Sequence, residues 1–245
     1  QSFPPPDQWA LVPSLRPLDA AGVMSLPVIS VKQMRRWEAA TWESSKTEEE
    51  VIAQVGELVA SRVMELTRPC DSILLLAGKG HNGDDVRAVA NHLPEREVRL
   101  LSITDPFKTR QKLPLDLDPA PALVVDGLFG IGLNRPLNAD WMQVIEQINA
   151  KRLRVLSVDT PSGLDATTGE VQGAAVRATE TVTLGAPKRG LMQPSASEFV
   201  GQLRVAPDIG LAPCLETSDL MLGQTEDFVG FPPARPTGGH KGTFG

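Results

Sequence analysis

Two aspartates in this sequence, Asp126 and Asp159, stand directly after short apolar runs and are the side chains best placed for chemistry. Each opens a polar loop, residues 126–136 and 159–165. A carboxylate at the end of a buried strand is costly unless a cation, an arginine or backbone donors meet it. With hydroxyl and amide oxygens nearby, two such acids suit a hard cation, or one acid held for proton transfer. The simpler interpretation of Asp126 is that it only satisfies loop amides.

A third polar loop, residues 78–85, is rich in glycine and also follows an apolar run. Glycines let backbone N–H groups approach an anion closely, and a helix starting after the loop would add positive potential. The pattern therefore indicates a phosphate site, although turns of this composition are often only turns. Asp84 and Asp85 would repel a phosphate unless one of them points away or caps the helix.

The elements that position these loops alternate between helices and strands. Ser30 caps an expected helix from Val31, and a capping box of Thr47 with Glu50 starts another whose apolar stripe runs to Leu66. Further helices are expected over residues 86–93 and behind Asn138, and strands over residues 72–77, 98–103, 123–125, 155–158, 180–184 and 202–205. The run of residues 72–77 lacks polar alternation, as in a strand covered on both faces.

Strands separated by helices predict a parallel, doubly wound α/β sheet. Ligands bind beyond the carboxyl ends of such strands, which is where the three polar loops fall. If successive strands are neighbours, Asp126 and Asp159 should lie close together.

Composition excludes several classes of function. The chain has 245 residues, 24 basic and 30 acidic, and its formal net charge of −6 argues against nucleic-acid binding, which needs a basic face. No apolar run approaches the ~20 residues that cross a bilayer, and no signal peptide is apparent, so we expect a cytoplasmic protein without a membrane partner. Cys70 and Cys214 are far apart, which favours reduced, structural thiols.

The chain divides into three expected parts. Residues 1–27 carry six prolines without periodicity and are interpreted as an N-terminal arm or linker. Residues 28–230 form the α/β domain. Residues 231–245 hold further prolines and a cluster of glycines and are interpreted as a linker running into something the chain does not contain.

Four sequence blocks resemble the NAD(P)H-hydrate epimerase family, the YjeF-type N-terminal domain. They are Gly-x-Gly-x-Asn-Gly-x-Asp (78–85), Val-Asp-Gly-Leu-Phe-Gly-Ile-Gly-Leu (125–133), Val-Asp-Thr-Pro-Ser-Gly-Leu-Asp (158–165) and Gly-Ala-Pro-Lys-Arg-Gly-Leu (185–191). Their order and spacing match the family over residues 27–213. The resemblance implies a Rossmann-like three-layer α/β/α sandwich, with a mainly parallel doubly wound sheet, that assembles as a homodimer.

The resemblance also implies an isomerase of nicotinamide nucleotide repair. Family members interconvert the R and S epimers of NADHX and NADPHX, the hydrated forms of the reduced dinucleotides. A companion dehydratase consumes only one epimer. Residues 240–245 resemble the opening of that dehydratase domain, which implies that this chain is the front half of a bifunctional epimerase/dehydratase.

Site residues follow from the matching positions. The implied potassium ligands are Asn82, Asp126 and Ser162, and the implied catalytic residues are Asp159 and Lys188, the latter with a surface or salt-bridge role as its alternative. The implied dinucleotide-binding residues are Gly80, His81, Asn82, Gly83, Asp84, Asp85, Gly130, Ile131, Gly132, Leu133, Asn134, Arg135, Pro136 and Asp159.

The glycine-rich block departs from the family, whose usual Asn-Asn-Gly-Gly-Asp-Gly reads His-Asn-Gly-Asp-Asp-Val at residues 81–86. Asp84 therefore stands where a glycine usually lies beside a phosphate. This departure keeps a second hypothesis open: a catalytically degenerate module that binds a nucleotide-like ligand or supports assembly with a dehydratase domain. An ordinary NAD-dependent dehydrogenase is a poor fit, because the loop lacks the third glycine of that fingerprint.

Overall fold

The computed structural model describes residues 25–44, 46–223 and 227. Its main sheet has the order β3-β2-β4-β5-β6-β7, and every neighbouring pair is parallel. The strands are β2 (Ser72–Ala77), β3 (Glu97–Ser102), β4 (Leu123–Gly127), β5 (Val155–Val158), β6 (Glu180–Leu184) and β7 (Gln202–Ala206). The predicted parallel, doubly wound sheet is confirmed.

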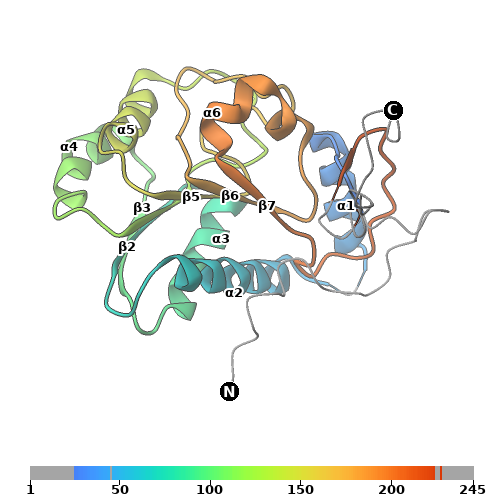
Figure 1. Ribbon diagram of the computed structural model, residues 1–245, viewed down its shortest axis with the longest axis horizontal. Helices are drawn as coiled ribbons and strands as arrows, with labels where there is room; N and C mark the ends of the chain where they lie inside the picture. The colour runs from blue at the N-terminus through green and yellow to red at the C-terminus, as the bar shows by residue number, and fades with distance from the viewer. Residues whose placement is uncertain (1–24, 45, 224–226, 228–245) are drawn as a thin grey trace, which may run out of the picture.

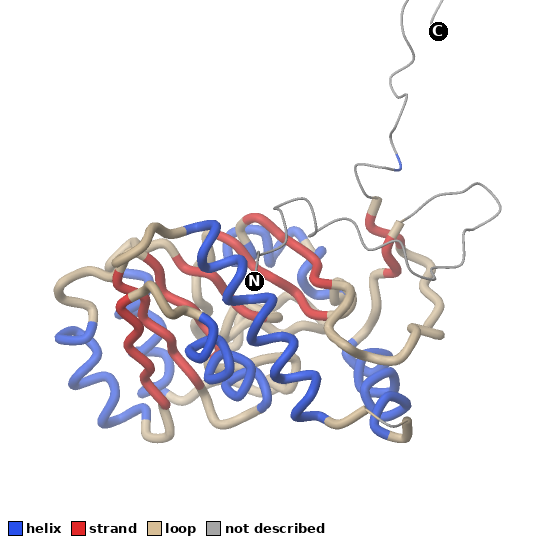
Figure 2. The backbone as a smooth tube through the Cα atoms, turned by 90° about the horizontal axis from the view of Figure 1, so that it is seen from below, coloured by secondary structure: helices blue, strands red, loops and turns tan. Residues whose placement is uncertain are grey.

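Helices cover both faces of this sheet (Figure 1). On one face, α2 (Glu48–Leu66) and α3 (His81–Val89) pack valines against the odd-numbered residues of β2. On the other, α4 (Pro106–Asp116) and α5 (Ala139–Ala150) pack against Leu74 and Leu76. Seen from below in Figure 2, the long helix α2 lies across the sheet. This is the predicted Rossmann-like three-layer sandwich.

Helix starts follow the predicted caps. Gln33 N–H donates to Ser30 Oγ (3.2 Å) at the start of α1 (Val31–Trp42), and Glu50 N–H donates to Thr47 Oγ1 (3.2 Å) at the start of α2. Both caps are reciprocal boxes, because Gln33 and Glu50 each accept from the N–H of the capping residue. Asn138 caps α5 through Trp141 N–H (3.0 Å).

One predicted boundary is wrong. Residues 81–85, expected in a loop, form the first turns of α3, with Gly80 as N-cap. The helix starts early because two glycines allow a close backbone approach: a Cβ on Gly83 would lie 2.1 Å from the carbonyl oxygen of Gly78. The helix α4, which begins at Pro106 behind the Asp105 cap, was not predicted at all.

A second, two-stranded antiparallel sheet joins β1 (Leu26–Pro27) to β8 (Met221–Leu222). Helix α1 is held beside it, because Trp37 Nε1 donates to Ala212 O (2.7 Å) and Arg36 pairs with Glu216 (2.5 Å). We call β1, α1 and residues 209–222 the α1 clasp. Leu26 is buried, so the last residues of the expected N-terminal arm belong to the folded domain.

The other two expected parts lie largely outside the described residues. Residues 1–24 of the expected arm and residues 231–245 of the expected linker are not described, so their interpretation stays a prediction. Where the chain is described, no helix is both long enough and apolar enough to cross a membrane.

Candidate active site

A cavity of about 850 Å³ lies at the carboxyl edge of the main sheet. Its walls come from α1, the starts of α2 and α3, and the loop between β4 and α5. Asp159, directly after β5, and Leu184, the last residue of β6, also line it. The cavity therefore occupies the edge at which a parallel α/β sheet binds ligands.

Asp159 is held rigidly at the edge of the cavity. Its backbone has φ 64°, a left-handed conformation that a non-glycine residue adopts only when its surroundings impose it. Leu184 N–H donates to Oδ1 (3.2 Å), and the Lys188 ammonium forms an ion pair with the same oxygen. Among the described residues no group donates to Oδ2, so the second oxygen is free to meet a ligand.

Lys188 lies behind Asp159 and does not line the cavity. It is fully buried, and its three N–H groups go to Asp159 Oδ1, Thr183 Oγ1 (3.2 Å) and Leu184 O (2.7 Å). A buried ammonium needs such partners. The interpretation of Lys188 as a surface residue is thus wrong. Its geometry is that of a buried salt bridge with Asp159. Lys188 is not among the residues that line the cavity, so the structure does not place it in contact with a ligand there.

Asp126 is fully buried one strand away from Asp159. Its carboxylate accepts from Ser157 Oγ (2.8 Å), Leu128 N–H (3.2 Å) and both the N–H (2.9 Å) and Oγ (2.6 Å) of Ser162. Burial raises the pKa of Asp126, and these four donors work against that rise. β4 and β5 are neighbours, as the sequence predicted, and Asp126 faces Ser157 across the pair.

The three predicted potassium ligands come together through the backbone of Phe129. Asn82 Nδ2 donates to Phe129 O (2.9 Å), and Phe129 N–H donates to Ser162 Oγ (2.9 Å), which in turn donates to Asp126. Because Asn82 donates through Nδ2 to the carbonyl of Phe129, the other atom of its side-chain amide, Oδ1, points away from that carbonyl. That oxygen is buried and has no hydrogen-bond partner within the described part of the chain.

These oxygens are hard donors: an amide, a hydroxyl, a backbone carbonyl and a carboxylate. Groups of three or more His, Cys, Asp or Glu able to hold a metal ion do not occur among the residues that the structure describes. The donor set suits a cation such as potassium, which prefers carbonyl and amide oxygens, and it does not suit zinc.

Most of the predicted dinucleotide-binding residues line the cavity. The lining set from that prediction is Gly80, His81, Asn82, Asp85, Asp159 and every residue from 130 to 136. Gly83 and Asp84 do not line it. Gly83 packs on Gly78, and the half-exposed carboxylate of Asp84 pairs with Arg87 (2.7 Å). The charge that the sequence places beside a phosphate is therefore turned away from the cavity and paired with Arg87.

The sequence analysis missed the contribution of α1. Met34, Arg35, Glu38 and Trp42 of this helix line the cavity. Burial, followed by the nearby charge of Asp159, raises the pKa of Glu38, while Lys188, His81 and Arg35 act in the opposite direction. A signal was present: Glu38 follows the buried Met34 by four residues and so shares its face of the helix.

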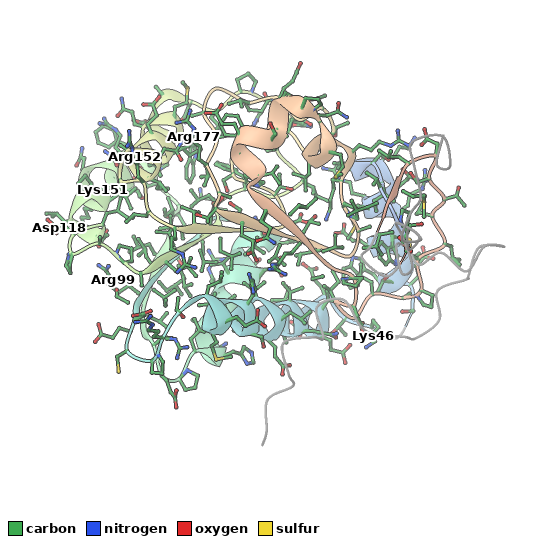
Figure 3. The ribbon with its side chains drawn as sticks, in the orientation of Figure 1. Lys46, Arg99, Asp118, Lys151, Arg152 and Arg177 are labelled. Atoms are coloured by element: carbon green, nitrogen blue, oxygen red, sulfur yellow. The ribbon has the colours of Figure 1, made fainter. Side chains whose placement is uncertain are left out.

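Asp85 is the most perturbed acid of the cavity. Burial raises its pKa well above the usual value for aspartate, and the charges of Asp159, Asp84, Glu38 and Glu48 add to the rise. Of the basic residues that the structure describes, Arg35, His81 and Arg135 line the cavity. Figure 3 shows Lys151, Arg152 and Arg177 at the α5 side of the molecule and Lys46 near α1, and none of them lines the cavity.

Comparison with known proteins gives consistent matches. The family model described as "YjeF-related protein N-terminus" matches residues 102–190. The NAD(P)H-hydrate epimerase of Achromobacter xylosoxidans is 36% identical over 190 residues, covering 69% of this chain and 88% of that protein. The NAD(P)H-hydrate epimerase of Limosilactobacillus fermentum is 31% identical over 206 residues, covering 76% of this chain and 99% of that protein.

Longer relatives match over part of their length. The bifunctional NAD(P)H-hydrate repair enzyme Nnr of Thermofilum pendens is 32% identical over 247 residues, which cover 90% of this chain but 47% of that protein. Among solved structures, the crystal structure of yeast ynu0 superposes with a TM-score of 0.58 over 81% of this chain and 100% of that chain. At 20% sequence identity, this likeness supports the fold alone.

Proposed function

Because the chain belongs to the NAD(P)H-hydrate epimerase family, we propose that it interconverts the R and S epimers of hydrated NADH and NADPH. The observation that carries the proposal is the carboxylate of Asp159, which faces a cavity lined by the matching sequence blocks. The epimerase names of the relatives do not favour the alternative of a degenerate module. The turned-aside Asp84 removes the main argument for that alternative.

The residues fit the chemistry that this reaction needs. The hydrated carbon bears a hydroxyl beside a ring nitrogen, so its inversion requires loss and return of the hydroxyl oxygen, or ring opening. Both routes need a positioned acid/base. We assign this role to Asp159, since it lines the cavity, its Oδ1 is anchored, and its Oδ2 has no donor among the described residues. Lys188 is a positioning residue in this proposal, because it reaches the cavity only through Asp159.

Substrate binding is assigned to the two cavity walls that match the family. In this proposal Gly80, His81 and Asn82 at the start of α3 meet the phosphate and ribose, and residues 130–136 wrap the dinucleotide. Gly83 supports the turn from behind.

Potassium is the proposed cofactor. The unpartnered oxygen of Asn82 is the observation that fits it, because a buried acceptor without a donor is the natural ligand of a cation. Asn82, Asp126 and Ser162 would hold the ion, with Phe129 linking them. When bound, the ion would supply positive charge beside Asp126 and tie the loops together.

Three further expectations remain proposals. A dehydratase-like domain in the full-length protein is supported by the bifunctional relatives, of which the match covers about half. A homodimer and a cytoplasmic location follow from the family resemblance and from the composition.

The test supplies purified R-epimer NADPHX and follows the appearance of the S form. We expect the protein to accelerate the conversion well above the spontaneous rate. Melting curves in potassium and in sodium salts of equal ionic strength test the cofactor separately, since an ion that binds only the folded state raises the melting temperature. Asn82→Ala should remove that difference. A rate equal to the spontaneous one would defeat the epimerase proposal, and equal melting curves would defeat the potassium site.

A further inference from the structure

We infer that Asp85 is a second catalytic residue of this site and donates the proton to the departing hydroxyl, while Asp159 acts as the base. This inference rests on the proposed epimerase function and divides its acid/base work between two carboxyl groups. Neither the sequence analysis, which gave Asp85 a binding role, nor the relatives' names assign it this task.

The burial of Asp85 without a partner is the first observation. Only 8% of the residue is exposed, and it lines the cavity from the start of α3. No hydrogen bond or ion pair joins its carboxyl group to any described residue. Asp126 and Asp159 are also buried, but both have partners. Four groups donate hydrogen bonds to Asp126, and Lys188 forms an ion pair with Asp159. A carboxylate that served only the fold would be satisfied in the same way.

The charges around Asp85 are the second observation. Acids face it from three elements besides its own: Glu38 of α1, Glu48 of α2 and Asp159 after β5; Asp84 adds a fourth from α3. Three of the cations in and around the cavity are already paired with acids, whereas Arg35 and Arg135, which line the cavity, form no ion pair with a described residue. Lys188 pairs with Asp159, Arg87 with Asp84 (2.7 Å) and His81 with Glu48 (3.0 Å). Arg35 lowers the pKa of Glu38.

These surroundings favour the protonated form of Asp85 over the anion. Burial and four like charges raise its pKa well above the usual value. The dipole of α3 favours the anion by only ~1 kcal/mol or less, which is too little to offset burial among like charges. Asp159, whose Oδ1 is paired with Lys188, lines the same cavity and is placed to accept a proton, so the two carboxyl groups can share the acid and base roles.

With Asp85 as acid and Asp159 as base, every proton and electron pair is accounted for when the hydroxyl is lost and returns. The C6–O bond breaks and its electrons leave with the oxygen, which takes the Asp85 proton and departs as water. The lone pair of the ring nitrogen forms the C=N bond of an iminium ion. Water then adds to the other face of the ring, giving up a proton to Asp159 Oδ2. Proton transfer from Asp159 back to Asp85, directly or through water, restores the starting state.

The experiment compares Asp85→Asn with Asp140→Asn in the complete chain. Asp140 is the matched control, because it is also an aspartate near a helix start but pairs with Arg110 (2.7 Å) and does not line the cavity. We expect Asp85→Asn to lower kcat by roughly 10²–10³-fold while the Kd for NADPHX changes by less than about 3-fold. Asp140→Asn should match the wild type.

The pH profile gives a readout that a structural role would not produce. Wild-type kcat should fall as pH rises and Asp85 loses its proton, and this fall should be absent from the slow Asp85→Asn variant. At neutral pH, the wild-type infrared spectrum should contain a carboxylic-acid C=O band that the variant lacks. Absence of that band from folded wild-type protein would overturn the inference without any use of substrate.

The outcomes separate the inference from the function on which it rests. If the wild type is fast and Asp85→Asn is equally fast, the acid role is wrong and the epimerase proposal stands. A variant that loses only affinity, with kcat unchanged, also overturns the acid role. If the wild type does not exceed the spontaneous rate, the epimerase proposal fails and the acid role fails with it.

Discussion

Asp159 has two carboxylate oxygens in different surroundings, and this asymmetry is what a positioned base requires. Oδ1 is fixed by Lys188 and Leu184 N–H, while Oδ2 accepts no hydrogen bond from any described residue, and Asp159 lines the cavity. The left-handed backbone of Asp159 adds to the constraint. A side chain held in this way loses little conformational freedom when a substrate arrives, so its orientation contributes directly to the rate.

Replacing Asp159 by Asn keeps the shape of the side chain but removes the base. We expect kcat for epimerisation to fall by roughly 10²–10⁴-fold with little change in NADPHX affinity, because a base acts in the transition state more than in binding. Single-turnover rates and equilibrium titration measure the two quantities. If affinity is lost and kcat kept, Asp159 is a binding residue and the assignment is wrong.

At the scale of single residues, the sequence predicted the acids of the strand ends and missed the acid of a helix. Asp126 and Asp159 could be found because buried strands end in polar loops at one edge of a parallel sheet. The burial of Lys188 behind Asp159 was unpredictable, since a Gly-Ala-Pro-Lys turn does not show which way its lysine points. Glu38 was missed because no motif surrounds it.

At the scale of elements, α1 is a wall of the cavity as well as a part of the fold. Its apolar side packs Met34 and Trp37 against Ala186 and Ile29, and its next turn brings Glu38 to the cavity. Stability and binding therefore depend on the same helix. A substitution on the buried side of α1 should therefore weaken substrate binding although the substituted residue does not contact the substrate.

Trp37→Ala tests this dependence. Loss of a buried indole should destabilise the domain by about 3–5 kcal/mol, and the poorly held helix should raise the KM for NADPHX more than it lowers kcat. Trp37→Phe is the matched variant, because it keeps an aromatic ring at this position and loses the Ala212 hydrogen bond with part of the indole volume, so it should destabilise the domain less than Trp37→Ala. Urea unfolding and steady-state kinetics measure both. An unchanged KM in Trp37→Ala would show that α1 is not part of the binding wall.

Capping residues predicted the start of a helix where the cap bonds to a residue in the first turn of that helix. They did not predict it where the start of the helix depends on packing against another segment. Ser30, Thr47 and Asn138 each hydrogen-bond a residue three positions ahead, so sequence spacing reveals them. The start of α3 depends on Gly83 fitting against Gly78, a contact across a turn that propensity does not show. The poor helix formers of residues 80–85 therefore looked like a loop.

Across the whole molecule, the acids are distributed unevenly. Glu38, Asp85 and Asp126 all have a raised pKa at or beside the carboxyl edge of the sheet, with burial as the first cause. A carboxyl group whose pKa is raised by folding holds a proton that the unfolded chain releases. Its contribution to stability is complete below the unfolded pKa, about 4, and is lost as pH rises towards the folded value.

Asp85→Asn removes one such group and should change the pH dependence of global unfolding. At neutral pH we expect the variant to melt higher than the wild type by at least about 3 °C, and the difference should shrink as pH falls towards about 4. Scanning calorimetry across this range measures it. Asp140→Asn should show no such trend. A constant difference at every pH would mean that folding does not raise the pKa of Asp85.

The α1 clasp also determines how the domain would respond to mechanical tension. Leu26 and Leu222 face each other at the outer end of the β1–β8 pair, so a pull between them would open the ladder from one end, one bond after another. The parallel main sheet would stay closed while the clasp peeled away. Because α1 forms a wall of the cavity, tension of this kind would release a bound dinucleotide before it unfolded the domain.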